Sequence, residues 1–558
     1  MSYITQKARD QIKSIILNSA QKAALSGDFI CVPENAFSID VPENRDHGDY
    51  AVNAALVWAK SLKKAPRMIA ETILKFADFD NSYIEKCEIA GPGFINFFFK
   101  DSYFSDIIED VIEKGSDYGK SDFGQNKRIL VEFVSANPTG PMHIGNARGG
   151  ALGDCLAAVL EKAGYYVERE FYINDAGNQI NKFGLSLDLR YQQIYKEGIE
   201  MPEDSYHGED IIAHAKAFAE IHGASFLDRP ESERRKALVE FALPKNIQGL
   251  KDDLLKYRIS YDTWFKESSL HRSGETDRII ELLIKSGKTY ESDGALWFKA
   301  TDYGCDKDFV LRRANGVPTY VVPDIAYHYN KLEIRKFDRA IDILGADHHG
   351  YVPRLKAALT ALGTDASRLD AVLMQMVRLV RNGEVIKASK RSGKAITLVT
   401  LLEEVPIDAA RFFFNLREPN SHFDFDLDLA VSESSNNPVY YVQYAYARIC
   451  SVIRNVGEPD TAEKSDFDLL KAPEERELVS HISAFTDEII KSAKAYDPAR
   501  ITHYVVELAT KFHKFYSSCR VNCEDAALKN ARLCLCKATA EVIKNVLDAF
   551  KISAPEKM

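Results

Sequence analysis

The amino-acid sequence predicts an α/β protein built around a parallel sheet that binds a nucleotide. An apolar segment over Ile129–Val134 reads as a buried strand, and Asn137–Pro141 ends it with two prolines and a glycine. Apolar residues then repeat with helical period over Asn146–Ala163, and Gly164 follows as the helix end. Tyr165–Ile173 reads as the next strand. These elements form a βαβ unit, whose turn lies at the sheet edge where such folds bind ligands.

The beginning of this helix is suited to a phosphate group, because the free amides of a helix N-terminus attract anions. His143, Gly145 and Asn146 occupy that position. Three glycines on the first turns allow close backbone approach to a ligand: Gly149, Gly150 and Gly153. A histidine beside a turn is more often structural than catalytic, but here it stands in a full strand–turn–helix context.

The string Ala136–Asn146 resembles the HIGH signature of class I aminoacyl-tRNA synthetases, in the form found in arginyl-tRNA synthetases. Asn146 replaces the final histidine of that signature, and an amide N–H still donates to a phosphate oxygen. The resemblance implies a class I Rossmann-like catalytic domain with a parallel sheet. It also implies His143 and Asn146 as catalytic residues that contact ATP together with Pro141 and Gly145.

A second element with the character of an active site lies downstream. Met374–Ala388 predicts a hairpin around Asn382-Gly383, a type I′ turn signal. From Arg378 to Lys394 there are six basic residues and one acid, a local charge of +5 in a chain of net charge −10. Most charge runs are solvated loops. A loop rich in glycine and serine can instead place cations over a triphosphate and stabilise a departing pyrophosphate.

The segment Lys387–Arg391 resembles the KMSKS loop of the same family. Both lysines, Lys387 and Lys390, are present, which implies that they are catalytic and bind ATP. Gly345–Gly350 resembles the family's loop beside the ATP ribose, which implies ATP contacts from Gly345, Asp347 and His349. Asp347 with the two histidines after it could imitate a metal cluster, but class I enzymes need only the magnesium that accompanies ATP.

Two acids near the sheet edge bear on the amino-acid substrate. Glu132 stands inside an otherwise apolar strand, and Asp324 ends the apolar run Thr319–Val322. A buried acid costs free energy unless a cation pairs with it, and that cation could be a protein arginine. In arginyl-tRNA synthetases the matching residues contact arginine, whose planar guanidinium can bind carboxylates bidentately. The resemblance therefore implies arginine binding by Glu132, Asn137, Tyr320 and Asp324.

Three domains are expected. Residues 1–115 resemble the family's N-terminal additional domain, an α+β module that contacts the tRNA elbow, with a strand-like stretch over Cys87–Phe99. Residues 116–400 form the catalytic domain, with a helical, highly charged insertion around 185–290 that carries few strand signals. Strand-like segments resume at Ala295–Phe298, Phe309–Leu311, Thr319–Val322 and Arg339–Leu344.

Residues 401–558 predict an all-α domain with one strand-like exception, Phe423–Leu429, where acids and apolar residues alternate. Asp408–Arg411 matches the DALR signature that opens the family's anticodon-binding domain, with Ala410 in place of the leucine. One helix then carries several tyrosines and an arginine. Such stripes are usually core, yet they also suit stacking on unpaired bases, so both interpretations stand for Tyr440, Tyr444 and Arg448.

Composition limits the remaining possibilities. No stretch of 18 apolar residues and no signal-peptide core are present, so a cytoplasmic protein without a membrane span is expected. Nine cysteines without CxxC pairs argue against a disulfide framework, and Cys519 and Cys523 do not meet zinc spacing, so no structural zinc is expected. The acidic balance gives no support to nucleic-acid binding, so a tRNA partner requires local basic patches.

Taken over the whole chain, the resemblance implies an arginine–tRNA ligase. ATP with Mg²⁺ would activate L-arginine to arginyl-adenylate, and the 3′ end of tRNA(Arg) would take the arginyl group, with the chain acting as a monomer and without a bound prosthetic group. Two alternatives remain: another HxGH nucleotidylyltransferase, which would lack the long helical C-terminal domain, and a non-catalytic RNA-binding paralogue, which would not need His143, Lys387 and Lys390.

Overall fold

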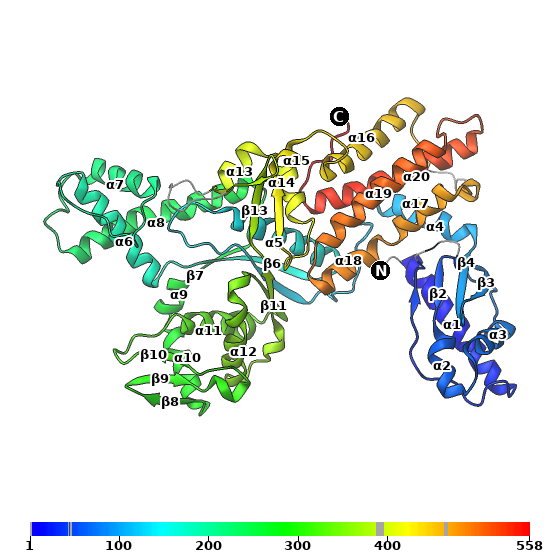
Figure 1. The fold of residues 1–558 in the computed structure, drawn as a ribbon, viewed down its shortest axis with the longest axis horizontal. Coiled ribbons are helices and arrows are strands. Elements are labelled where there is room, and N and C mark those ends of the chain that lie inside the picture. The colour runs from blue at the N-terminus through cyan, green and yellow to red at the C-terminus, as the bar shows by residue number, and fades with distance from the viewer. Residues whose placement is uncertain (1–2, 43, 45–46, 387–395, 462–466) are drawn as a thin grey trace.

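The structure is a computed structural model that describes residues 3–42, 44, 47–386, 396–461 and 467–558. The molecule is elongated (Figure 1). Its central sheet lies between a group of helices at one end, α6 to α8, and a bundle of C-terminal helices at the other. The N-terminal unit lies below the C-terminal helices, and a further α/β unit lies below the central sheet.

Five parallel strands form the central sheet, in the order β12-β11-β5-β6-β7. Their bounds are β5 Arg128–Glu132, β6 Tyr166–Ile173, β7 Thr263–Lys266, β11 Arg339–Gly345 and β12 Leu369–Met374. From β5, the strands β6 and β7 extend the sheet to one side, and β11 and β12 extend it to the other. A crevice is therefore expected between the carboxyl ends of β5 and β11, where sheets of this type bind ligands.

Helix α5 (Ile144–Lys162) connects β5 to β6 and confirms the predicted βαβ unit. Gly164 follows it with φ of +91°, as expected at a helix end. Its glycines serve packing: a Cβ on Gly153 would lie 2.2 Å from the ring of Phe133, and one on Gly150 would lie 2.8 Å from Ile259. At these two positions the close approach is thus to the protein core and not to a ligand.

The chain between β6 and β7 forms a helical insertion with its own small core. Its helices are α6 Gly177–Gln193, α7 Glu209–His222 and α8 Glu231–Lys256. Strand β7 lies within the range that was expected to be mainly helical and returns the chain to the edge of the central sheet. It has four residues, none of them fully buried, so it lacks the apolar run that marks a strand in sequence.

The next unit packs around a separate core that includes residues of α11 and α12. Its elements are α9 Glu267–Arg272, α10 Glu275–Lys285, β8 Thr289–Ser292, β9 Ala295–Phe298, β10 Phe309–Arg312, α11 Val321–Tyr329 and α12 Val352–Ala361. The antiparallel order is β10-β9-β8. The strand predicted over Thr319–Val322 is wrong, because α11 begins at Val321. Pro323 falls in its first turn, where a helix needs no N–H donor.

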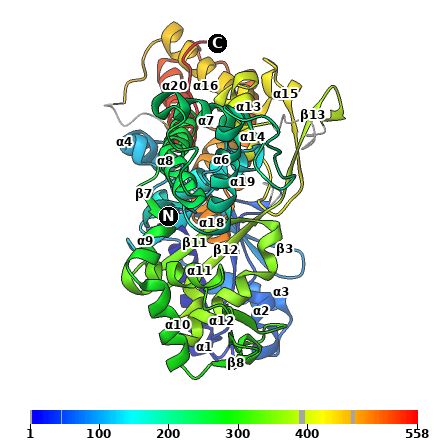
Figure 2. The same cartoon turned by 90° about the vertical axis from the view of Figure 1, so that its left-hand side faces the viewer.

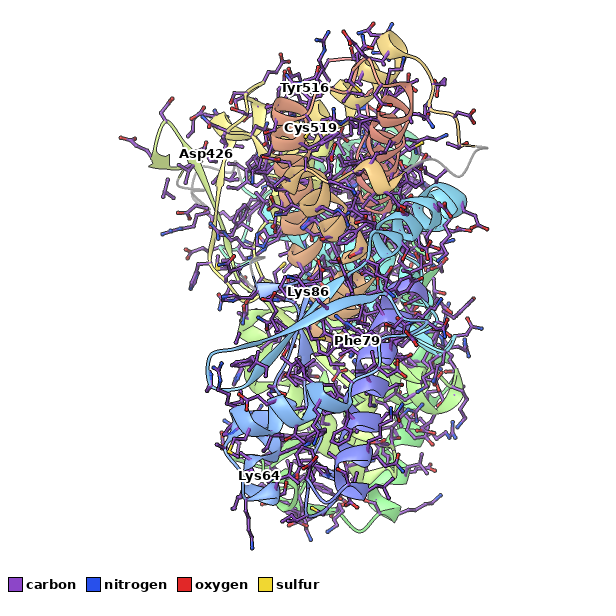
Figure 3. The ribbon with its side chains drawn as sticks, turned by 90° about the vertical axis from the view of Figure 1, so that its right-hand side faces the viewer. Lys64, Phe79, Lys86, Asp426, Tyr516 and Cys519 are labelled. Carbon is purple, nitrogen blue, oxygen red and sulfur yellow. The ribbon has the colours of Figure 1, made fainter. Side chains whose placement is uncertain are left out.

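The N-terminal unit contains a four-stranded antiparallel sheet in the order β1-β2-β4-β3. Its elements are α1 Tyr3–Leu25, β1 Ile39–Asp40, β2 Tyr50–Val52, α2 Ala54–Leu62, α3 Pro66–Phe76, β3 Ile84–Ala90, β4 Phe94–Phe99 and α4 Asp101–Lys114. The predicted strand-like stretch Cys87–Phe99 is the hairpin of β3 and β4. Figure 3 shows this unit, with Lys64, Phe79 and Lys86, beneath the helices that carry Tyr516 and Cys519.

A small sheet in the order β14-β13-β15 contains the first residues of the basic segment Arg378–Lys394 and a strand from further along the chain. It consists of β13 Val377–Arg381, β14 Glu384–Val385 and β15 Phe423–Asp426. Asn382 and Gly383 have φ of +52° and +76°, which confirms the predicted type I′ turn. The strand predicted over Phe423–Leu429 is correct only for its first four residues, since helix α15 begins at Leu427. Asp426 accepts the N–H of Leu429 and caps that helix.

The remaining helices complete the chain, and in Figure 2 α16 and α20 lie at the top, above the N-terminal helices α1 to α3. Their bounds are α13 Leu398–Glu404, α14 Ile407–Phe414, α15 Leu427–Val431, α16 Pro438–Val456, α17 Pro473–Ser483, α18 Phe485–Ala495, α19 Ala499–Ser518 and α20 Ala526–Ala549. Among the described residues, no helix has the length and apolar character needed to cross a membrane.

The DALR-like residues connect these helices to α5. Arg411 is fully buried and donates to the Asp154 carboxylate of α5 at 2.5 Å, and to the carbonyl of Phe550 at 2.7 Å. Asp408 accepts from Arg258 at 2.5 Å. One continuous apolar core runs from the N-terminal unit through α5 to α20. The residues of this signature therefore have a structural role here, because they connect the C-terminal helices to α5 and to Arg258.

Candidate active site

The N-terminus of α5 is arranged to hold an anion. His143 is the N-cap residue and is exposed, and its backbone N–H donates to Asn146 Oδ1 at 2.9 Å. Asn146 therefore takes the capping role that a residue at this position often plays. No residue in the described ranges accepts a hydrogen bond from Asn146 Nδ2, so the amide donors are available to a phosphate oxygen.

Backbone pairing brings residues 396–398, which follow the basic segment, to this helix end. Ile144 donates its N–H to the carbonyl of Ile396 at 3.2 Å, and Leu398 donates to the carbonyl of Met142 at 2.9 Å. The hairpin β13–β14 leads into the segment on its other side. Lys387 and Lys390 themselves lie outside the described residues.

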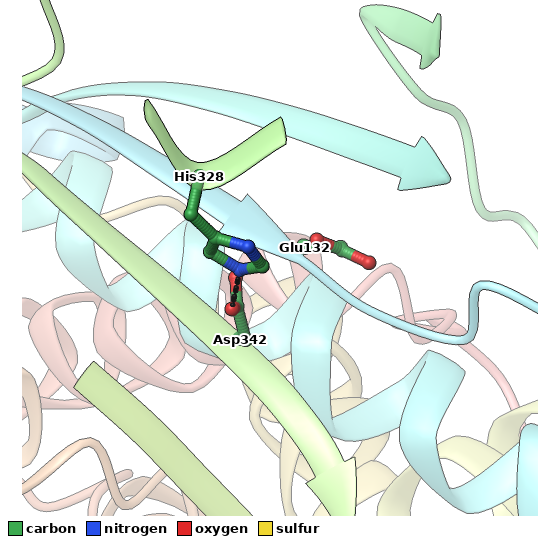
Figure 4. Close-up of side chains that lie close together, drawn as sticks. All are labelled: Glu132, His328 and Asp342. Carbon is green, nitrogen blue, oxygen red and sulfur yellow. Dashed lines mark hydrogen bonds and ion pairs between the residues drawn. The ribbon is translucent and has the colours of Figure 1, made fainter. Parts of the chain in front are cut away.

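A cavity of about 240 Å³ opens between the carboxyl ends of β5 and β11, at the place expected from the strand order. Three carboxylates line it: Glu132 at the end of β5, Asp342 on β11 and Asp324 on α11. Glu132 and Asp342 are direct partners across the two strands. Figure 4 shows these two acids with His328. The cavity is therefore acidic and suited to a cation.

Glu132 already has a protein cation. Its Oε2 accepts from Lys331 Nζ at 2.5 Å, and its Oε1 accepts from Ser135 Oγ at 2.8 Å. A protein cation therefore pairs with this acid, as in the alternative interpretation, although the partner is a lysine and not an arginine. The sequence analysis did not identify Lys331 as the partner of Glu132. The sequence signal for its burial is its position in a helical pattern of apolar residues with Tyr327 and Leu332.

Asp324 is different, because no cation pairs with it among the residues that the structure describes. Its carboxylate accepts from the Tyr351 hydroxyl. Burial raises the pKa of Asp324 to about 6, although the hydrogen bond from Tyr351 partly offsets this. It lies in the first turn of α11 and not at the end of a strand, so the predicted secondary structure at Asp324 is wrong. Its side chain nevertheless lines the cavity. Asp324 is thus the carboxylate left for a ligand.

The other two expected arginine contacts lie outside the cavity lining. Tyr320 is 71% exposed, and its ring is 6.1 Å from that of Tyr351, centroid to centroid. Asn137 is exposed on the turn after β5. Neither residue lines the cavity. Both would need to turn inward to contact a ligand there.

The expected ATP loop follows β11 directly. Gly345 and His348 line the cavity, with His348 supplied by the short 3₁₀ helix Ala346–Gly350. Asp347 and His349 are exposed and do not line it. Pro141 is likewise exposed, beside His143. Of these expected ATP contacts, Gly345 therefore lines the cavity, whereas Pro141, Asp347 and His349 lie outside its lining.

The expected tRNA contacts gather on one face of α16. The rings of Tyr440 and Tyr444 are nearly parallel, 8° apart, and the Arg448 guanidinium lies 4.6 Å from the Tyr444 ring centre. All three are half-buried, whereas Tyr446 is buried core. The stripe is therefore partly core and partly open.

Two residues that sequence reasoning missed complete this face. Tyr516 of α19 lies on the other side of Arg448, 5.2 Å from its guanidinium. Together with Arg520, it lines a surface hollow of about 840 Å³ that also includes Tyr444 and Arg448. The hollow combines aromatic rings with several cations, which is the chemistry that binds unpaired bases.

Comparison with known proteins agrees with this arrangement over the full length. The sequence profile described as "tRNA synthetases class I (R), catalytic domain" matches residues 107–432, "Arginyl tRNA synthetase N terminal domain" matches 10–99, and "DALR anticodon binding domain" matches 442–558. The arginine–tRNA ligases of Acetivibrio thermocellus and Caldanaerobacter subterraneus are each 51% identical, over 100% of both chains.

Solved structures show the same fold. The arginyl-tRNA synthetase of Thermus thermophilus has a TM-score of 0.74 at 22% identity and covers 98% of this chain and 100% of its own. That of Plasmodium falciparum has a TM-score of 0.72 at 20% identity and covers 98% and 99%. The profile matches and the close relatives establish the family: the chain belongs to the arginyl-tRNA synthetases, the class I ligases that charge tRNA with arginine.

Proposed function

We propose that the cavity between β5 and β11 binds L-arginine and that Asp324 is the counter-ion of its guanidinium. The observation that supports this most directly is the buried Asp324 carboxylate, which has no ion-pair partner in the described part of the chain and faces a cavity at the switch point of the sheet. A guanidinium would supply the missing cation. Glu132, Asn137 and Tyr320 contribute to the same substrate from the cavity wall and rim.

ATP, in this proposal, lies across the N-terminus of α5, where His143, Gly145 and Asn146 meet its phosphates. Gly345, Asp347 and His349 contact the ribose side, Pro141 borders the helix end, and Lys387 and Lys390 neutralise the leaving pyrophosphate. Mg²⁺ accompanies ATP. The chain's own residues mainly position the reactants and stabilise charge, because attack of the arginine carboxylate on the α-phosphate needs little covalent help.

The tRNA spans the molecule. Residues 1–115 take the elbow, 116–400 carry the reaction centre, and 401–558 take the anticodon at the hollow beside Tyr440, Tyr444 and Arg448. A single chain contains all three parts around a shared core, which supports action as a monomer. Sedimentation of the enzyme at assay concentration tests that state.

One assay tests the activity itself: aminoacylation of total tRNA with each of the twenty amino acids. We expect charging with arginine alone, into tRNA(Arg). Charging with another amino acid would overturn the substrate assignment. Failure to charge any tRNA while binding it tightly would favour a non-catalytic RNA-binding protein.

The arginine affinity is expected to fall in acid. Because burial raises the pKa of Asp324 to about 6, the ionised form that a guanidinium needs is present above that pH and is lost below it. The kcat/KM for arginine should therefore fall roughly tenfold per pH unit below pH 6. Measuring the profile for Asp324→Asn supplies the control, since an amide does not titrate. A profile in the wild type that is flat from pH 7 to 5 would contradict the assignment.

The hollow on the C-terminal helices predicts a separable effect on tRNA. Changing Tyr516 to Ala removes a ring beside Arg448, and base stacking of this kind contributes about 1–3 kcal/mol. The tRNA KM should rise about tenfold, while the arginine and ATP KM values stay unchanged. Lys544→Ala, which removes an exposed cation on α20, is the matched control. Equal tRNA KM values for the two variants would place the anticodon elsewhere.

A further inference from the structure

Lys331 is a lysine in an unusual place. It follows α11 within a short π-helix, Asn330–Ile334, and its side chain is completely buried. Turns of this type interrupt helices mostly at functional positions. A fully buried ammonium is costly unless other groups pair with it. The fold therefore places a buried positive charge next to the arginine cavity but outside its lining.

The ammonium bridges the two strands that frame the cavity. Lys331 Nζ lies 2.5 Å from Glu132 Oε2 and 2.8 Å from Asp342 Oδ1. Burial alone would lower the pKa of Lys331, but the charges of Asp342 and Glu132 raise it above its ordinary value. Burial likewise opposes ionisation of Asp342, yet Lys331 and His328 hold its pKa well below the usual range. Lys331 thus forms ion pairs with both acids.

His328 extends this network toward Asp324. Its Nε2 lies 2.6 Å from Asp342 Oδ2, and its Nδ1 lies 2.7 Å from the backbone carbonyl of Asp324. Both ring nitrogens therefore lie next to oxygen atoms. Of the three carboxylates that line the cavity, Glu132 and Asp342 are paired with Lys331. Asp324 remains without a cation among the described residues, and a single guanidinium would supply one.

The same geometry shows that the ammonium lies where the surrounding side chains could otherwise hold a metal ion. Glu132, His328 and Asp342 each offer a ligand atom, and these atoms lie within 4.8 Å of one another, close enough to hold a metal ion (Figure 4). Carboxylates and imidazole are the ligands that Zn²⁺ and Co²⁺ accept. Lys331 Nζ stands among them, with its third contact 3.5 Å away at His328 Nε2.

We propose that Lys331 is a specificity-determining residue: its ammonium fills the cation position between Glu132 and Asp342, which keeps divalent metal ions out of the arginine cavity and leaves one uncompensated carboxylate for the substrate. This inference rests on the proposed assignment of the cavity to arginine. It makes Lys331 a positioning residue, because it acts through Glu132 and Asp342 and does not itself line the cavity.

The test uses the full-length enzyme and Co²⁺ as the probe. Lys331→Met removes the charge with a side chain of similar length, and we expect it to bind Co²⁺ at least about tenfold more tightly than the wild type, with visible absorption bands and a rise in melting temperature on metal addition. Lys331→Met/Asp342→Asn removes one ligand and restores the charge balance. It should lose the gained affinity, which also controls for metal bound at cysteines elsewhere.

Two results would overturn the proposal. One is equal Co²⁺ affinity in the wild type and Lys331→Met. The other applies even if Lys331→Met fails to fold: the charge-balanced double variant should keep its arginine KM within about tenfold of the wild type, whereas a rise as large as that of Asp324→Asn would mean that Lys331 or Asp342 holds the substrate directly. An unchanged arginine KM in Asp324→Asn would instead refute the cavity assignment itself, so the two failures are distinguishable.

Discussion

Replacing Asp324 by Asn should raise the arginine KM about a hundredfold or more, with little change in the ATP KM. The reason is that the guanidinium would lose the only carboxylate in the described cavity wall that has no internal cation, and removing one partner of a buried charge pair costs about 2–5 kcal/mol. Steady-state pyrophosphate exchange in the presence of tRNA measures both constants.

The stability of this variant should not fall. A carboxylate whose pKa burial raises to about 6 is held ionised at neutral pH against its surroundings, so the neutral amide is at least as well tolerated. Tyr351 can still donate to the amide oxygen. Asp277→Asn, an exposed change on α10, is the matched control. A large drop in melting temperature with an unchanged arginine KM would show that Asp324 is structural.

The pairing of Asp324 with a guanidinium also leads to an expectation for substrate analogues. Citrulline has nearly the shape of arginine but no charge, and lysine has a point charge that does not fit the planar fork geometry. Both should be rejected by a factor of roughly 10⁴, because buried polar groups would be left without partners. Competition assays against arginine measure this factor, and citrulline activated within tenfold of arginine would contradict it.

Changing His143 to Ala should lower kcat by about 10²–10³ and leave the arginine KM nearly unchanged, as loss of one donor to a developing charge does. The expectation follows from its exposed N-cap position at α5, beside residues 396–398, which pair with the backbone of Met142 and Ile144. His207→Ala, an exposed histidine of the insertion, should leave kcat unchanged. A kcat for His143→Ala close to the wild type would place the phosphates away from this helix end.

The sequence predicted the parts of the fold that depend on neighbours along the chain. The strand, turn and helix around Asn137–Pro141 were predicted because proline, glycine and helical period act within a few residues. The Asn382-Gly383 turn was predicted for the same reason. Short or half-buried elements were missed, as with β7, and the run Thr319–Val322 was read as a strand although it leads into a helix.

The chemistry of the site was predictable only in outline. Sequence alone determined that Glu132 needs a cation, since an acid in an apolar strand needs one wherever that strand lies. Only the tertiary structure decided which cation it has: Lys331, 199 residues away, which reaches it through a π-helical turn that no local pattern announces. The same holds for Asp324, whose lack of an internal partner became visible only with the groups around it in place. Helical period and turn chemistry are properties of adjacent residues, whereas charge pairing in a buried site depends on which distant segments the fold brings within a few ångströms.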